Sequence, residues 1–178
     1  AAISKPLVLI MLTDKWLPAV PFMQIMCISG AINSVTNANL QAMKAIGRSD
    51  IVLKLEFAKK PVGLLMIVVT MNISVTAIAW TMPVYAIYAA AVNMKPNKNL
   101  IGYGLKRQIK DLIPATVYSL AMYFAIKVVS LVELPILLSL ILQVMTGAGV
   151  YLALAYFTKA DAFQYIVGYG KDLIKRKI

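Results

Sequence analysis

Five apolar stretches of membrane-spanning length constrain the fold of this 178-residue chain more than any other feature. A transmembrane α-helix needs about 20 mostly apolar residues to cross a bilayer. The predicted spans are residues 16–43, 50–72, 74–92, 112–131 and 134–157. Hydrophobic residues make up 61% of the chain, which leaves too little polar surface for a soluble domain. We therefore expect an all-α fold, a polytopic bundle of about five transmembrane helices.

Three further segments lie outside these spans. Residues 1–12 contain an apolar run that is too short to cross a bilayer, so we expect the end of a preceding transmembrane helix. The chain would then be the C-terminal part of a longer protein. Residues 95–111 and 158–178 alternate apolar and basic residues with helical spacing, which predicts a cytoplasmic interfacial segment and a basic amphipathic tail. Anionic membrane lipids are the expected partners of both segments.

The basic residues indicate how the chain is oriented. Most of its 18 Lys and Arg residues fall within residues 44–60, 95–110 and the tail, and the alternate connections hold very few. Cytoplasmic connections of membrane proteins are enriched in Lys and Arg, so we expect a multi-pass protein with a cytoplasmic C-terminus. No basic cluster is interleaved with stacking aromatic residues outside the apolar runs, so nucleic acid is not an expected partner.

The sequence offers little material for catalysis or metal binding. It contains no His, and its single Cys, Cys27, lies within an apolar run. Histidine is the commonest general base and metal ligand, and a thiol inside an apolar run usually acts as a small hydrophobe. We expect neither an enzyme nor a metal site, and no cofactor.

Amide side chains interrupt the first predicted span. Asn33, Asn37 and Gln41 recur every four residues and therefore share one face of a helix, with Gln24 higher in the same helix and Asn39 to one side. An unpartnered amide in hydrocarbon costs on the order of several kcal/mol. The row must then face other helices or a wet cavity. Two interpretations stay open: hydrogen bonds that hold the bundle together, or a cavity lining that binds a substrate rich in hydroxyl groups.

Charged residues follow the amide row. Lys44 and Arg48 lie at the cytoplasmic end of the same span, where they would attract a phosphate group. Glu56 lies within the next predicted span and is a candidate coupling acid, because acids in transmembrane helices are often functional. The alternative for Glu56 is a local ion pair with Lys59 or Lys60, which follow it by three and four residues.

Three stretches in order carry a resemblance to a known family: KPLVLIMLTDKWLPAVPFMQI, NANLQAMKAIGRSD and LKLEFAKK. They resemble the C-terminal part of Wzx-type O-antigen and polysaccharide flippases. These proteins belong to the multidrug/oligosaccharidyl-lipid/polysaccharide (MOP) exporter superfamily, which also includes the MATE drug exporters. The resemblance is specific over roughly the first third of the chain, and only the pattern KRQIKDLIP continues it beyond that point.

The resemblance implies a two-lobed bundle of about 12 to 14 helices in the bacterial inner membrane, working by alternating access. Its substrate would be an undecaprenyl-diphosphate-linked oligosaccharide, the repeat unit of O-antigen, capsule or exopolysaccharide. Other polysaccharide assembly proteins would be partners. The candidate substrate contacts are Gln24, Asn33, Asn37, Gln41, Lys44 and Arg48.

Three alternatives remain at this point. A MATE-like cation-coupled drug exporter would need an acid deep in an apolar helix. A membrane-embedded polysaccharide polymerase or glycosyltransferase would need a large periplasmic loop or clustered acids and bases. A purely structural membrane subunit would need neither, and the amides would then serve only to join helices.

Overall fold

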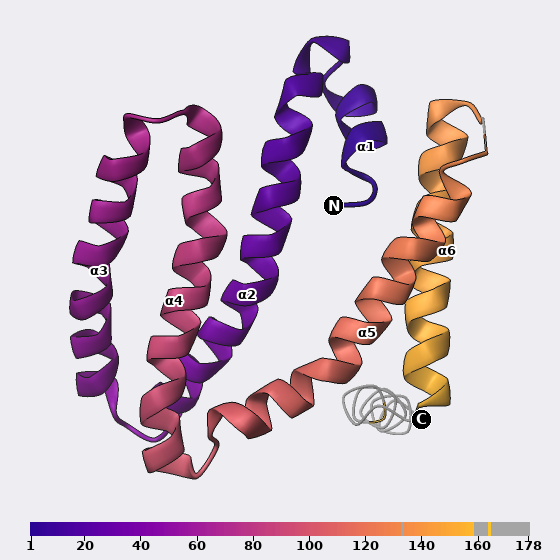
Figure 1. Ribbon diagram of the computed structural model, residues 1–178. Coiled ribbons are helices and arrows are strands. Elements are labelled where there is room, and N and C mark those ends of the chain that lie inside the picture. Colours follow the sequence, from indigo (N-terminus) through magenta and orange to yellow (C-terminus); the bar gives the residue numbers. More distant parts are fainter. Residues whose placement is uncertain (133, 159–163, 165–178) are drawn as a thin grey trace, which may run out of the picture. The chain divides into compact units, whose positions relative to one another are not determined.

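The computed structural model describes residues 1–132, 134–158 and 164, and every regular element within them is helical (Figure 1). The order is α1 (Ser4–Met11), the 3₁₀ helix η1 (Asp14–Ala19), α2 (Val20–Ala45), α3 (Ser49–Met71), α4 (Val75–Ile101), α5 (Leu105–Val129) and α6 (Ile136–Phe157). The all-α prediction is confirmed for these residues. The predicted amphipathic tail, residues 158–178, lies outside the described residues except for Thr158 and Gln164.

Four stretches of the described chain are long and apolar enough to cross a membrane. They are Asp14–Ala45, which joins η1 to α2, and the helices α4, α5 and α6. These helices support a membrane protein. The remaining predicted span, residues 50–72, corresponds to α3, whose charged residues Glu56, Lys59 and Lys60 interrupt its apolar run.

The connection between α4 and α5 is shorter than the sequence pattern indicates. Helix α4 continues through Pro96 to Ile101, beyond the predicted end at Val92. Gly102 then adopts a left-handed conformation with φ of 67°, the usual way to end a helix, and α5 begins at Leu105. The segment 95–111 therefore consists of the last turns of α4, a tight turn and the first turns of α5.

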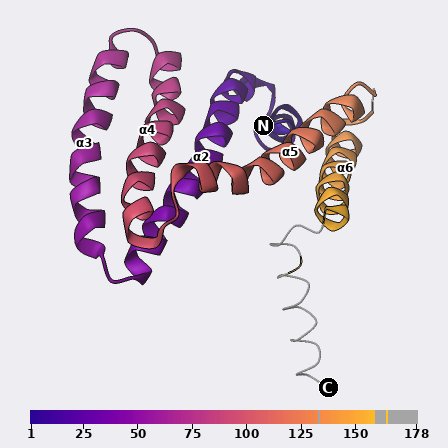
Figure 2. The ribbon, with the colours of Figure 1, turned by 60° about the horizontal axis from the view of Figure 1, so that its bottom comes forward.

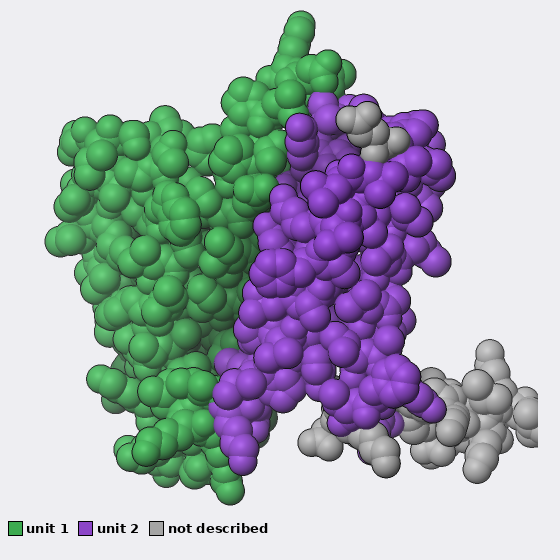
Figure 3. All heavy atoms as spheres, turned by 45° about the vertical axis from the view of Figure 1, so that its right-hand side comes forward, with its two compact units in different colours: residues 1, 12–109 green, residues 2–11, 110–178 purple. Residues whose placement is uncertain are grey.

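The chain divides into two compact units, which are coloured separately in Figure 3. Unit 1 contains Ala1 and residues 12–109, and unit 2 contains residues 2–11 and 110–178. In unit 1, α2, α3 and α4 lie side by side in both ribbon views (Figures 1 and 2). In unit 2, α1 packs on α6, and the hydroxyl groups of Tyr118 and Thr158 share a hydrogen bond.

Helices α2 and α4 form the most extensive pairing of unit 1. Both run in the same direction, whereas α3 runs opposite to them (Figure 1). Their buried residues follow a three-and-four spacing, which is typical of helices that share a long contact. We call this contact the α2–α4 seam. Its buried residues include Ile25, Ser29, Thr36, Asn39 and Met43 of α2 and Pro83, Ala86, Ala90, Asn93 and Asn97 of α4.

Candidate functional site

Three buried amides join the ends of α2, α4 and α5 in unit 1. The side chains of Asn39, Asn97 and Gln108 are 5%, 0% and 2% exposed. The Nδ2 atom of Asn97 donates to Oδ1 of Asn39, and Nδ2 of Asn39 donates to Oε1 of Gln108 over 2.8 Å. We call these three residues the amide network.

Backbone groups complete the amide network. Nδ2 of Asn39 also donates to the carbonyl of Val35 over 3.0 Å, and Nε2 of Gln108 donates to the carbonyl of Tyr103 over 2.9 Å. The carbonyl of Asn97 accepts from the N–H of Tyr103, so the turn between α4 and α5 is fixed at both ends. Buried polar groups must find partners, and the side-chain bonds that join Asn39 to Asn97 and to Gln108 tie one helix to another. The network therefore sets the relative positions of these helix ends.

The predicted amide row has a different environment. Asn33, Asn37 and Gln41 are all exposed, and none donates or accepts a hydrogen bond with another described side chain or backbone group. At about 100° per residue, the row lies about 120° around α2 from its buried stripe. Gln24 is also exposed, on the first turns of α2. The structure therefore separates the amides of α2 into a bonded face and an open face.

Lys44 and Arg48 lie exposed at the end of α2 and in the turn after it. The guanidinium of Arg48 pairs with the carboxylate of Asp50, with Nε–Oδ1 3.1 Å and Nη2–Oδ2 3.3 Å. Both side chains are about half exposed, so the pair is open to exchange with another anion.

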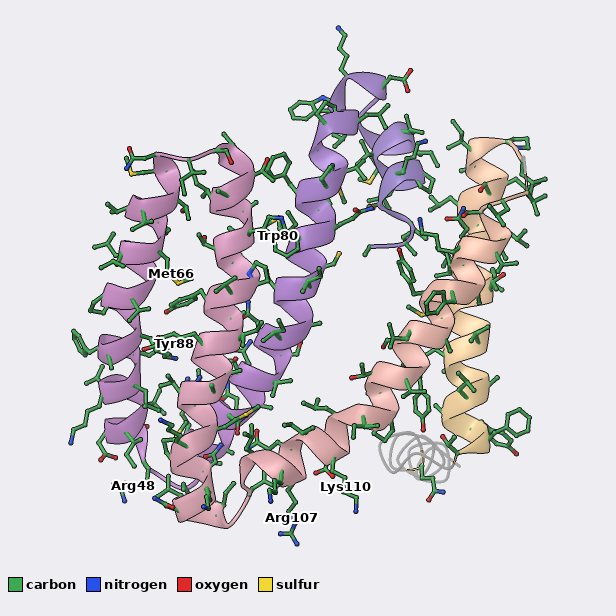
Figure 4. All side chains as sticks on the ribbon, viewed as in Figure 1. Arg48, Met66, Trp80, Tyr88, Arg107 and Lys110 are labelled. Carbon is green, nitrogen blue, oxygen red and sulfur yellow. The ribbon has the colours of Figure 1, made fainter. Side chains whose placement is uncertain are left out.

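Glu56 makes the local ion pair that was one of its two interpretations. Its Oε1 lies 2.5 Å from Nζ of Lys59, whose side chain is only 3% exposed. Lys60 instead places its ammonium 6.0 Å from the ring centre of Phe57. Tyr88 of α4 lies on the side toward α3 in Figure 4. Lys59 is therefore a buried cation whose nearest anion is Glu56.

The sequence pattern missed two members of the amide network. Asn97 and Gln108 fall in the segment that was predicted to be interfacial, so neither was expected inside a helix bundle. The sequence does hold a signal for Asn97: Asn93 and Asn97 are one helical turn apart, in line with the buried Ala86 and Ala90 of α4. A prediction that continued this helix past Val92 would have placed Asn93 and Asn97 on its buried stripe.

Comparisons with known proteins give no family for this chain. No protein-family model, curated protein or solved structure matches it. The resemblance to polysaccharide flippases therefore stays a prediction.

The chemistry that these side chains offer is hydrogen bonding and charge attraction. Among the described residues, no three His, Cys, Asp or Glu side chains gather closely enough to hold a metal ion. The open face of α2 offers amide donors and acceptors, and the end of the helix offers two cations. Such a surface suits a ligand with many hydroxyl groups and an anionic end.

Proposed function

We propose that this chain is part of a flippase that moves an undecaprenyl-diphosphate-linked oligosaccharide across the bacterial inner membrane by alternating access. The open amide face of α2 would contact the sugars, and Lys44 and Arg48 would attract the diphosphate. No covalent bond is made or broken in this mechanism. The observation that carries the proposal is the exposure of Asn33, Asn37 and Gln41 on a helix of membrane-spanning character.

The physical argument rests on solvation. A helix surrounded by lipid satisfies its own backbone but cannot satisfy exposed side-chain amides. Each amide of the row would cost on the order of several kcal/mol in hydrocarbon, so their face must meet water or polar groups. Sugars are suitable polar groups, because each hydroxyl both donates and accepts hydrogen bonds. A water-filled cavity that admits the glycan accounts for the row.

Charge supports the same arrangement. Arg48 and Arg107 both lie at one end of unit 1, the end where α2 and α4 finish (Figure 4). Cations gather at the cytoplasmic ends of membrane helices, and a diphosphate would be drawn to the same end. We place this end and the C-terminus in the cytoplasm. Anionic lipids would also associate with these basic residues.

The finer fold is also a proposal. Helix α3 runs beside α4 over a similar length, so we propose that it is a fifth spanning helix (Figure 1). Its buried Lys59 paired with Glu56 lowers the cost of carrying charge into the membrane. The whole protein would then be a MATE-like two-lobed bundle, with other polysaccharide assembly proteins as partners.

A cation-coupled drug exporter is less well supported by the geometry. Such a protein would need a carboxylate that is free to bind and release a cation or proton. Glu56 is the candidate in a described helix, and its carboxylate is already paired with Lys59. The amide face of α2, by contrast, has no role in that mechanism.

The decisive experiment replaces the amide row in the whole protein, expressed in the cell that produces it. Asn33→Leu, Asn37→Leu and Gln41→Leu together should abolish repeat-unit export and leave membrane insertion and protein level unchanged. The matched control exchanges the amides for each other, with Asn33→Gln, Asn37→Gln and Gln41→Asn, and should retain export. Surface polysaccharide at the normal level in the Leu variant would contradict the proposed function.

Cysteine labelling tests the orientation in a Cys27→Ala background. A membrane-impermeant maleimide should label Ser74→Cys, between α3 and α4, in intact cells with a permeable outer membrane. Asn99→Cys should react only after the inner membrane is opened. Both positions are exposed, so access to the reagent depends on the side of the membrane. The reverse pattern would overturn the orientation.

A further inference from the structure

The side chain of Asn93 is buried without any polar partner. It is 0% exposed, and neither its Nδ2 nor its Oδ1 atom has a hydrogen-bond partner among the described residues. One turn further along α4, Oδ1 of Asn97 also has none, although its Nδ2 donates to Asn39. Buried amides in folded proteins nearly always find partners, so two such groups on one stripe require an explanation.

A backbone carbonyl adds a third polar group. Pro96 lies inside α4, between the two amides, and has no N–H. The carbonyl of Val92, four residues earlier, therefore lacks the donor that a helix normally supplies. Proline is tolerated in membrane helices where neighbouring side chains or ordered water satisfy such a carbonyl. The residues around Pro96 thus hold one amide donor group and several oxygen acceptors.

One small molecule can bridge two side-chain amides that lie four residues apart, because such residues share one face of a helix with Cβ atoms about 5–6 Å apart. A water that makes one hydrogen bond of about 2.8–3.0 Å on each side joins polar atoms up to about 6 Å apart. Water also donates and accepts at once, as this mixture of groups demands.

We propose that α4 binds a structural water between Asn93 and Asn97. The water accepts a hydrogen bond from Nδ2 of Asn93 and donates to Oδ1 of Asn97 and to the carbonyl of Val92. Three hydrogen bonds are the usual number for a buried water. The site extends the amide network by one turn, so a continuous polar track runs from Gln108 of α5 through Asn39 and Asn97 to Asn93.

A bound cation fits these groups less well. A cation would be held by the oxygens but would leave Nδ2 of Asn93 without a partner. The amide hydrogens, which carry partial positive charge, would then face the cation. None of the described buried residues of the α2–α4 seam is a carboxylate that could balance the charge. Water can accept from Nδ2 of Asn93 and donate to two of the neighbouring oxygens at once.

Replacing Asn93 tests the proposal by the sign of its effect. Asn93→Leu keeps the branched shape and the number of side-chain heavy atoms but excludes the water, and it leaves Oδ1 of Asn97 and the Val92 carbonyl without a partner. The midpoint of thermal unfolding in detergent should fall by about 4 °C or more. Met94→Leu, a buried apolar exchange at the next position, is the matched control and should change the midpoint little. A higher midpoint for Asn93→Leu would mean an unhydrated orphan amide, which contradicts the proposal.

A measurement on the wild-type protein keeps the proposal testable if Asn93→Leu fails to fold. Magnetisation transfer in solution NMR should connect the Asn93 side-chain amide to a water with a long residence time. No transfer to water at that amide would overturn the site.

The identity of the salt cation gives a second test. The unfolding midpoint should be equal in sodium, potassium and choline chloride at one ionic strength. A rise in sodium alone would assign the site to a cation instead.

Discussion

The two faces of α2 carry the same kind of side chain in opposite circumstances. Asn39 lies in the α2–α4 seam and bonds to Asn97, Gln108 and a carbonyl of its own helix. Asn37, two residues earlier, is exposed and bonds to no other described residue. A change of two positions moves an amide by about 200° around the helix. Asn39 therefore has a structural role, whereas the role of Asn37 depends on what surrounds the helix.

The difference shows that an amide in a membrane helix can have either of two roles, depending on the face of the helix that carries it. On the buried face the hydrogen-bonding groups of the amide are satisfied within unit 1, because each polar side-chain atom of Asn39 has a polar partner there. On the open face its energy depends on what the helix meets in the membrane. The comparison therefore predicts large effects on stability from the buried face and large effects on transport from the open face.

The largest effect on stability is expected from Asn39→Leu. It leaves the buried amides of Asn97 and Gln108 without their main partners, which should lower the free energy of unfolding by about 2–3 kcal/mol. Reversible unfolding in detergent by a denaturant measures the change. Asn37→Leu is the matched control on the same helix, and equal losses in the two variants would remove the distinction between the faces.

The seam should also be sensitive to volume. Ala90 is buried in the seam, with only 7% of its surface exposed, whereas its neighbour Ala91 is exposed. Ala90→Leu should overpack the seam and lower the free energy of unfolding by about 1–3 kcal/mol, and Ala91→Leu should change it far less. The same unfolding assay compares the pair. An unaffected Ala90→Leu variant would show that α2 and α4 do not pack closely.

A double-mutant cycle sharpens the comparison further. Asn39→Leu and Asn97→Leu remove both partners of one hydrogen bond, so the double variant should be more stable than the sum of the single effects predicts. The coupling energy should be about 1 kcal/mol, in the range measured for interhelical hydrogen bonds in membranes. A cycle with Asn37→Leu in place of Asn39→Leu should give no coupling.

The smallest effect on stability is expected from the open face. Asn33→Leu removes an exposed amide that has no partner in the described chain, so the free energy of unfolding in detergent should change by less than about 0.5 kcal/mol. The unfolding assay described above applies. A loss as large as that of Asn39→Leu would mean that Asn33 holds the bundle together instead of lining a cavity.

Sequence patterns predicted the helical fold well and the site only in part. Hydropathy identified the long helices, because length and apolar content alone decide whether a helix can span a membrane. The amide row was placed on one face correctly, since spacing along a single helix fixes that geometry. The partners of Asn39 could not be predicted, because Asn97 and Gln108 lie 58 and 69 positions away and their contact depends on tertiary packing.

Pro96 explains the other miss. The Lys95–Pro96 pair resembles a connection, and proline usually ends or kinks a helix. Helix α4 nevertheless continues to Ile101, where the amide network and the left-handed Gly102 hold its end. A local rule was overridden by contacts that a single sequence does not reveal.

The central claim is that the open face of α2 meets water within the membrane. Reactivity of single cysteines with a small hydrophilic thiol reagent tests it directly in a Cys27→Ala background. Asn37→Cys should react much faster than Val68→Cys, an exposed position on the apolar face of α3, and the lipid-linked oligosaccharide that we propose as the substrate should slow the reaction. An Asn37→Cys side chain as unreactive as Val68→Cys would mean that this face lies against lipid or protein, and would contradict the account.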